Sequence, residues 1–504
     1  MSEKRTPFTT QSEWTFDLLE QYYNEIERIG KDYLELDIFP NQVEIISAEQ
    51  MLDLYSSVGM PISYGHWSYG KDFVKNAKEY KRGHMGLAYE IVVNTSPALV
   101  YCMEENTMMM QILVMAHAAI GHNAFFKNNY LFKQWTDAEG IVDYLVFAKK
   151  YIVECEEKYG IDEVEEVIDS CHALQSYGVD KYKRPAKISN TKEEQRQKER
   201  NDYLQSQVDD LWRTVPQSKF TIDITDQKRF PSEPQENILY FIEKNAPNLP
   251  IWKREIIRIV RKTSQYFAPQ RSTQVSNEGF ATFTHYQIMH KLHEEGLVDD
   301  GYMLEFYASH TAVVRQLPFD HKYYSGINVY ALGFAIYMDI KRMCEAPTVE
   351  DRLWFPNLVG KDWKEEVKYA MKNFKDDSFI LQYLSPKVMR DLKFFAIEDK
   401  QLYNDYTVTA IHDEAGYKSL RIKLAKQYDL ASREPNIQVF NVDRWGDRSL
   451  TLRHYMINEQ HLDDKSTREV LRHVVKLWGF DVKLQSVDDS DTIRESFEIL
   501  QVNH

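Results

Sequence analysis

The sequence predicts a mainly α-helical large domain followed by a smaller C-terminal α+β module. With 504 residues, the chain is too long for one ordinary hydrophobic core. Hydrophobic residues make up 43% of it and charged residues 28%, which is enough to fill a sizeable interior and to cover it. The apolar residues recur at helical spacing up to about residue 400 and alternate after it, so the class of fold changes there.

Helical spacing begins near the N-terminus and recurs through most of the large domain, which we assign to residues 1–400. The expected helices are 13–38, 46–58, 98–132, 137–159, 161–177, 236–245, 249–267, 277–296, 300–314, 328–344 and 362–375. The run 98–132 is apolar on nearly every face, which is typical of a helix surrounded by other helices. It therefore marks the centre of the domain.

A polar, charged stretch from about residue 185 to 235 interrupts this pattern. It has too few apolar residues to offset the entropy of ordering, so we expect an insertion with little regular structure. An exposed charged helix over 191–212 fits the same residues equally well.

The C-terminal module is assigned to residues 401–504. Its expected strands and helices follow one another as strand 406–412, helix 416–431, strands 437–443 and 449–456, helix 466–479 and strand 480–487. This β-α-β-β-α-β order is that of a ferredoxin-like sandwich. An irregular appendage with a hairpin is the alternative, and the fold alone says little about activity.

The net charge and the distribution of apolar residues argue against several classes of protein. A net charge of −15 argues against nonspecific binding to nucleic acid or to anionic lipid. The N-terminus has no apolar signal region, and no uninterrupted run of about 18 apolar residues occurs. The four cysteines are far apart, as reduced buried thiols are. We expect a cytoplasmic protein without a membrane span.

The segment MAHAAIGHNAFFKNNYLF, residues 115–132, contains two histidines five residues apart, His117 and His122. On an ideal α-helix they would be rotated by roughly 140° from each other and would not share a face. Gly121 permits a bend, a π-bulge or a helix end, and any of these could turn His122 toward His117. Because neutral imidazole binds zinc, iron and manganese, the pair predicts a site for one of these divalent metals.

Further ligands would have to come from elsewhere in the chain. In VSNEGFATFTHYQIMH, Glu278 and His285 fall on the same helical face, two turns apart. Glu90 is the best additional carboxylate. Asp169 and His172, three residues apart in a helix, are further candidates.

These residues define the predicted site. We expect them to converge in one polar cavity of the helical domain, with candidate metal ligands His117, His122, Glu278 and His285 and candidate catalytic carboxylates Glu90 and Glu278. A structural polar network that joins the helices without a metal is the alternative.

Several long motifs together resemble the stage V sporulation protein R (SpoVR) family, over nearly the whole chain. They are MAHAAIGHNAFFKNNYLF, CHALQSYGVDKYKRP, VSNEGFATFTHYQIMH, NVYALGFAIYMDIKR and DRSLTLRHYM. The resemblance implies a role linked to spore cortex formation, although the family is also common in bacteria that do not sporulate. It further implies two partners, an AAA-type serine kinase and a von Willebrand-like protein.

Two functions from different classes fit the residues. The first is a metal-dependent hydrolase acting on a cell-wall-related or peptide-like amide. EGFATF resembles the glutamate helix of some zinc peptidases, but those enzymes place a glutamate directly after the first histidine, where this chain has Ala118. Glu90 or another acid would then have to activate the water.

The second function is a noncatalytic scaffold or regulatory partner in a serine-kinase-linked stress pathway, which needs no metal. A di-metal carboxylate bundle ranks below both, because the paired ExxH motifs of such sites are missing from the sequence.

Overall fold

The computed structural model describes residues 5–57, 59–60, 62–82, 89–182, 229–400, 405–457 and 460–501. The chain divides into two compact units, and each is made of two separate segments. The first unit contains Met1–Glu165 and Gln265–Glu434, and the second contains Glu166–Ser264 and Pro435–His504. The expected insertion at 185–235 lies almost wholly outside the described residues, as does the alternative helix at 191–212.

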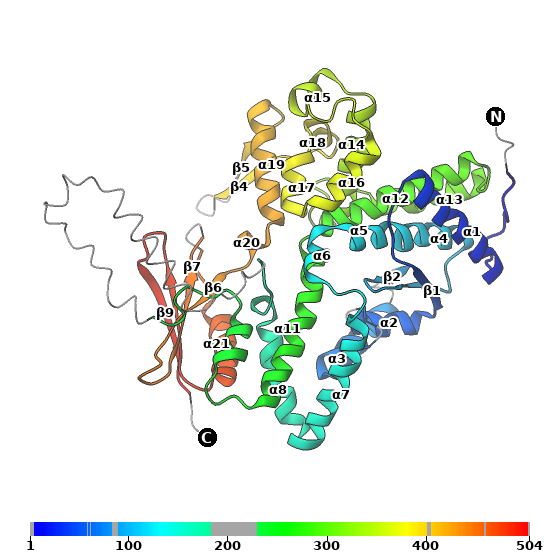
Figure 1. The fold of residues 1–504 in the computed structure, drawn as a ribbon. Coiled ribbons are helices and arrows are strands. Elements are labelled where there is room, and N and C mark those ends of the chain that lie inside the picture. The colour runs from blue at the N-terminus through cyan, green and yellow to red at the C-terminus, as the bar shows by residue number, and fades with distance from the viewer. Residues whose placement is uncertain are drawn as a thin grey trace, which may run out of the picture. The chain divides into compact units, whose positions relative to one another are not determined.

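The first unit is mainly helical, which confirms the predicted class (Figure 1). Its helices are α1 (Phe16–Arg28), η1 (Ile29–Tyr33), α2 (Ala48–Ser56), α3 (Trp67–Lys81), α4 (Met108–Met115), η2 (Ala116–His122), α5 (Asn123–Asn128), α6 (Tyr130–Trp135), α7 (Ile141–Tyr159), α12 (Gln274–Glu294), α13 (Asp300–Val313), α14 (Val329–Glu345), α15 (Val349–Trp354), α16 (Trp363–Asn373), α17 (Asp376–Tyr383), α18 (Pro386–Asp391), α19 (Glu414–Tyr428) and α20 (Leu430–Arg433). Two further helices contribute residues to both units, α8 (Ile161–Ala173) and α11 (Ile251–Arg271).

A three-stranded sheet precedes the central helices of the first unit. Its strands are β1 (Asn41–Ile46), β2 (Glu90–Val93) and β3 (Ala98–Met103), in the order β1-β3-β2, with β1 parallel and β2 antiparallel to β3. The prediction of a helix from residue 98 is therefore wrong for its first turns. A short apolar run fits a buried strand as well as a buried helix, and here the strand has partners on both sides.

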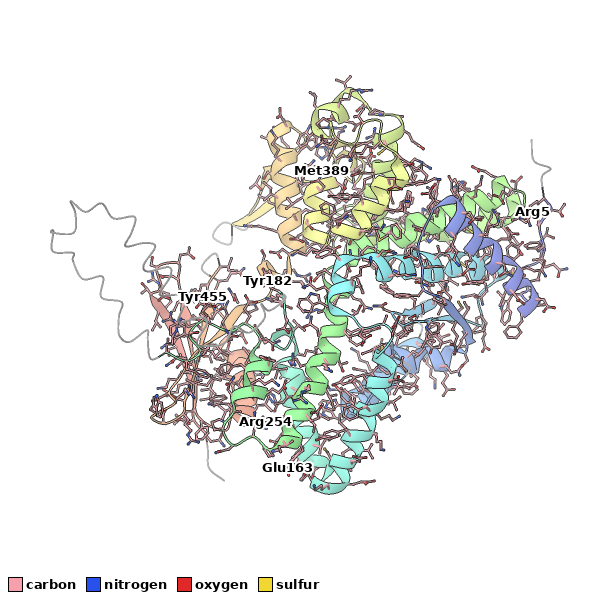
Figure 2. All side chains as sticks on the ribbon, in the orientation of Figure 1. Arg5, Glu163, Tyr182, Arg254, Met389 and Tyr455 are labelled. Carbon is pink, nitrogen blue, oxygen red and sulfur yellow. The ribbon has the colours of Figure 1, made fainter. Side chains whose placement is uncertain are left out.

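The core of the first unit is built around α12. Its side chains Phe280, Phe283 and Ile288 are buried on different sides of the helix. Figure 1 shows α4 and α5 beside α12, and η2 packs against the same helix. Figure 2 shows the side chains that fill this unit, among them Met389 of α18, which is fully buried. A helix buried on all sides carries any polar residue it has into the interior.

The run Met108–Asn128 is the one described helical segment that is long and apolar enough to cross a membrane. Its most apolar window is entirely buried inside the protein, as expected for a core helix.

Glycines allow α12 and α14 to pack backbone to backbone, and we expect Gly333→Ala to destabilise the first unit. The added Cβ would collide with the carbonyl oxygen of Val275 and would lie 2.7 Å from Cα of Gly279. Both are backbone atoms, so the helices would have to separate, which costs about 1–3 kcal/mol as overpacking does. Thermal melting measures this cost.

Gly70→Ala in α3 is the matched control for that substitution. Nothing lies within 4 Å of its added Cβ, and alanine stabilises a helix by roughly 0.5–1 kcal/mol relative to glycine. Equal melting temperatures for the two variants would contradict the close approach of α12 and α14.

The second unit holds the C-terminal α+β module, with η3 (Gln175–Tyr177) and α10 (Ile238–Asn245) from its earlier segment. The module contains β6 (Asn436–Val442), β7 (Leu450–Tyr455), α21 (Asp464–Trp478), β8 (Val482–Val487) and β9 (Ile493–Ile499). The sheet order is β6-β7-β8-β9. The pair β7–β8 is parallel and joined through α21, and the other two pairs are antiparallel.

The predicted β-α-β-β-α-β elements follow one another along the chain, but they do not assemble into one ferredoxin-like sandwich. The strand β5 (Asp405–Ala410) pairs with β4 (Ala396–Lys400) in the first unit, and α19 lies in the core of that unit. The C-terminal module therefore begins at Pro435 rather than at residue 401, and its order is β-β-α-β-β. The hydrophobic pattern of the sequence locates strands and helices, but it does not identify which of them pair or pack with one another.

The two segments of the second unit are interleaved. Phe241 of α10 stacks on Trp478 of α21, with ring centroids 6.0 Å apart. The backbones of Gln235 and Val439 exchange two hydrogen bonds, at 2.9 Å and 2.8 Å. The module thus shares both its core and its sheet edge with the middle of the chain.

Candidate metal centre

A π-helix turns the two histidines of the HxxxxH spacing toward the same side. The residues of η2, Ala116–His122, continue α4 without a break and lead into α5. A π-helix closes its hydrogen-bonded turn over five residues, so His117 and His122 lie about one turn apart, with ring centroids 4.6 Å from each other. Of the local structures that Gly121 permits, the π-helix is the one present.

Gly121 has a second role at this point. A Cβ on this residue would lie 2.6 Å from Cα of Ala281, so only glycine lets η2 approach α12 this closely. The contact brings the histidines next to Glu278, three residues before Ala281 on α12.

Glu278 completes a group of three potential ligands. Its Oε2 lies 3.7 Å from Nε2 of His117 and 3.5 Å from Nε2 of His122. Ligand atoms of the three residues all lie within 4.8 Å of one another. Bonds of about 2.0–2.2 Å from zinc to nitrogen and oxygen place neighbouring ligand atoms about 3–4 Å apart, so the group fits such an ion.

The buried Oε2 of Glu278 has no hydrogen-bond donor among the described residues. A buried carboxylate oxygen without a donor is costly unless a cation neutralises it. This oxygen is the atom on which both Nε2 atoms converge, so the unsatisfied charge lies at the position where a metal would be held.

The electrostatics distinguish the two carboxylates of the site. Burial by itself raises the pKa of Glu278, but the imidazoles of His122 and His117 lower that pKa below its usual range. Glu90, whose Oε1 lies 3.8 Å from Nε2 of His117, has a pKa raised mainly by burial. Burial and the two carboxylates raise the pKa of the Tyr330 phenol. Glu278 is therefore the ionised carboxylate, and Glu90 takes up a proton more readily.

Each histidine of the group faces Glu278 with Nε2 and has a hydrogen-bond partner at its other ring nitrogen, Nδ1. Nδ1 of His122 lies 2.9 Å from Oδ1 of Asn277, to which it donates. Nδ1 of His117 lies 3.0 Å from Nδ1 of His285. Metal-binding histidines are oriented in this way, by a hydrogen bond on the nitrogen that does not bind the ion.

The structure does not place His285 among the candidate ligands. Its ring lies behind His117, and its Nε2 is 3.0 Å from Nδ1 of His310. Burial lowers the pKa of His285 well below its usual value and lowers that of His310 to about 4, so both rings are neutral at pH 7. The predicted ligand role of His285 is thus replaced by a supporting one.

His310 was not predicted from the sequence. Its only signal is its place on the apolar face of α13, four residues after Phe306 and eight after Tyr302, both buried. Asp169 and His172, the other candidates, lie in the second unit.

A cavity of about 390 Å³ opens onto the group. It is lined by Glu90, Val92, His117, His122, Phe126, Gln270, Arg271, Gln274, Asn277, Glu278 and Tyr330. This volume suits a small ligand. A larger cavity of about 840 Å³ in the same unit is lined by residues such as Phe319, Phe394 and Leu424 and by none of the histidines, so it is not part of this site.

In comparisons with known proteins, two family models meet where the C-terminal module begins. The family model described as SpoVR like protein matches residues 13–433, and the SpoVR-like C-terminal domain matches 435–489. A protein of Escherichia coli (strain K12) named "Uncharacterized protein YcgB" is 57% identical over 493 residues, which cover 98% of this chain and 96% of that protein. No solved structure matches. With both regions matched, the chain belongs to the SpoVR family.

Proposed function

We propose that this protein is a divalent-metal-dependent hydrolase whose metal ligands are His117, His122 and Glu278. The observation that carries the proposal is the convergence of two imidazole Nε2 atoms on one buried carboxylate oxygen that lacks a donor. Two histidines and one carboxylate leave coordination positions open for water and substrate, as catalytic sites require.

The ion would supply an acidified water and a Lewis acid for the substrate carbonyl. Glu90 is the general base, since its carboxylate lies beside His117 and faces the same cavity. Tyr330 lines the cavity as well, and its hydroxyl can donate to the oxygen on which charge develops. The position after the first histidine, Ala118, cannot take the role of base.

The cavity wall suggests the kind of substrate. Gln270, Arg271 and Gln274 add amide and guanidinium groups at the junction of α11 and α12. The amides suit a substrate with peptide-like amides. The guanidinium of Arg271 pairs with Glu434 through one nitrogen, and its other N–H groups suit a carboxylate. A cell-wall peptide has both, which agrees with the role that the family resemblance implies.

Metal content and hydrolysis together test the proposal. Protein purified without an affinity tag is analysed for zinc, iron and manganese, and is then assayed for amine release from peptides, N-acyl amino acids and muropeptides. We expect a stoichiometric metal and a metal-dependent release that Glu278→Gln abolishes. A tightly bound metal with no hydrolysis of any of these amides would count against this function.

One observation favours the alternative of a noncatalytic regulatory partner. The polar groups continue from the cavity into the core through His285 and His310, as a structural network between helices would. In that case His117→Ala lowers the melting temperature without changing metal content. The two partners, an AAA-type serine kinase and a von Willebrand-like protein, and the cytoplasmic location stay predictions, which copurification and fractionation would test.

A further inference from the structure

Three imidazole rings form a continuous chain from the candidate metal centre into the core. His117, His285 and His310 come from η2, α12 and α13, and each neighbouring pair of ring nitrogens is 3.0 Å apart. All three residues are buried. Phe306 and Phe334 lie against the inner end, with Phe334 4.8 Å from the ring of His310. The ring nitrogens that face each other must therefore satisfy their hydrogen bonds within the chain of rings.

With all three rings neutral, two arrangements of protons satisfy this chain. A neutral imidazole has one N–H donor and one acceptor nitrogen, so two consecutive N···N hydrogen bonds must run in the same direction. In the inward arrangement, His117 donates to His285, and His285 donates to His310. In the outward arrangement, His310 donates to His285, and His285 donates to His117.

The two arrangements leave different atoms at the metal centre. In the inward arrangement, Nδ1 of His117 holds the proton and Nε2 presents a lone pair. In the outward arrangement, Nε2 of His117 holds the proton and points toward Glu90 and Glu278, 3.8 Å and 3.7 Å away. The same number of protons is present in both, so the change needs no uptake or release.

We infer that His310 is a positioning residue that determines, through His285, whether His117 can bind a metal. The inference rests on the proposed metal centre and adds a regulation of it. A metal on Nε2 of His117 selects the inward arrangement, and the chain carries that choice to His310, two rings from the ion. The acceptor that His310 offers to His285 is what stabilises the metal-binding state.

His310→Phe tests this dependence. Phenylalanine keeps an aromatic ring beside Phe306 and Phe334 but leaves the buried Nε2–H of His285 without an acceptor in the inward arrangement. The outward arrangement, in which His117 donates toward the carboxylates, is then favoured over the inward one. We expect zinc to bind about 10- to 100-fold more weakly, as when a partner behind a metal ligand is lost.

Two further variants separate this role from packing. His310→Asn keeps a polar oxygen close to the position of Nδ1, so near wild-type zinc affinity is expected. His290→Phe changes another histidine of the same aromatic group, whose ring lies 4.3 Å from that of Tyr286. Nε2 of His290 faces the hydroxyl of Tyr307 and not the three imidazole rings. It should leave zinc affinity unchanged.

The experiment combines zinc titration of the full chain with ¹⁵N NMR of the histidine rings. We expect zinc to place the protons of His285 and His310 on Nε2, and His310→Phe to change the signals of His117 even without zinc. Wild-type zinc affinity in His310→Phe, or unchanged His117 signals in the zinc-free variant, would overturn the inference. If zinc affinity and the histidine signals respond as expected but no amide is hydrolysed, the enzymatic function is refuted and this inference stands.

Discussion

Replacing Glu278 by glutamine should remove the metal from this protein while leaving the fold intact. Glutamine is nearly isosteric, but it supplies no negative charge beside His117 and His122. The loss of zinc affinity should exceed the about 10- to 100-fold that follows from removing a partner behind a ligand. Elemental analysis and zinc titration measure the affinity, and thermal melting of the zinc-free protein measures the fold.

Glu294→Gln provides the matched control, because this glutamate lies on the same helix, α12, and forms an exposed ion pair with Lys291. Its metal content should equal that of the wild type. The zinc-free melting temperature of Glu278→Gln should be unchanged or higher, since a buried carboxylate without a donor is removed. Full metal content in Glu278→Gln would eliminate this residue as a ligand.

Replacing Glu90 by glutamine should separate metal binding from catalysis. We expect hydrolysis to fall by about 10²- to 10⁴-fold, which is the usual contribution of a general base. Zinc should stay bound, because Glu90 is not one of the three grouped ligands, His117, His122 and Glu278. Initial rates of amine release at saturating zinc, together with the zinc content of the same sample, measure the two effects.

The outcomes for Glu90→Gln assign its role. Loss of zinc together with activity would make Glu90 a fourth ligand, and an unchanged rate would remove it from the mechanism. Glu104→Gln is the control, since this glutamate follows β3, is exposed and does not line the cavity. It should change neither rate nor zinc content.

Single features of the candidate site could be predicted because each depends on nearby residues in the sequence. The HxxxxH spacing with Gly121 indicated a π-bulge, and the apolar surroundings of Glu278 indicated a buried carboxylate. The structure places these groups, and Glu90, around one cavity. The position of His285 could not be predicted in the same way. Helical periodicity gives the face on which a residue lies, but not which side of His117 that face meets.

The helices could be predicted for a similar reason, and the strand pairing could not. Amphipathic spacing within α12 or α13 depends on neighbours a turn away. The pairing of β1 with β3 joins Asn41 to Ala98, and that of β4 with β5 places α19 in the first unit. Pairing of this kind depends on contacts far along the chain, so the apolar run from residue 98 was predicted as helix and the C-terminal module was predicted to start too early.

The interleaving of the second unit has a consequence for biosynthesis. On the ribosome, α10 emerges well before β6 and α21 are synthesised. Phe241 therefore has no Trp478 to stack on, and Gln235 has no Val439 to pair with. At synthesis rates of about 5–20 residues per second, the delay is on the order of tens of seconds. During that time, the apolar side of α10 is a natural site for a chaperone. A fragment starting at Pro435 lacks α10 altogether and should aggregate when it is expressed alone.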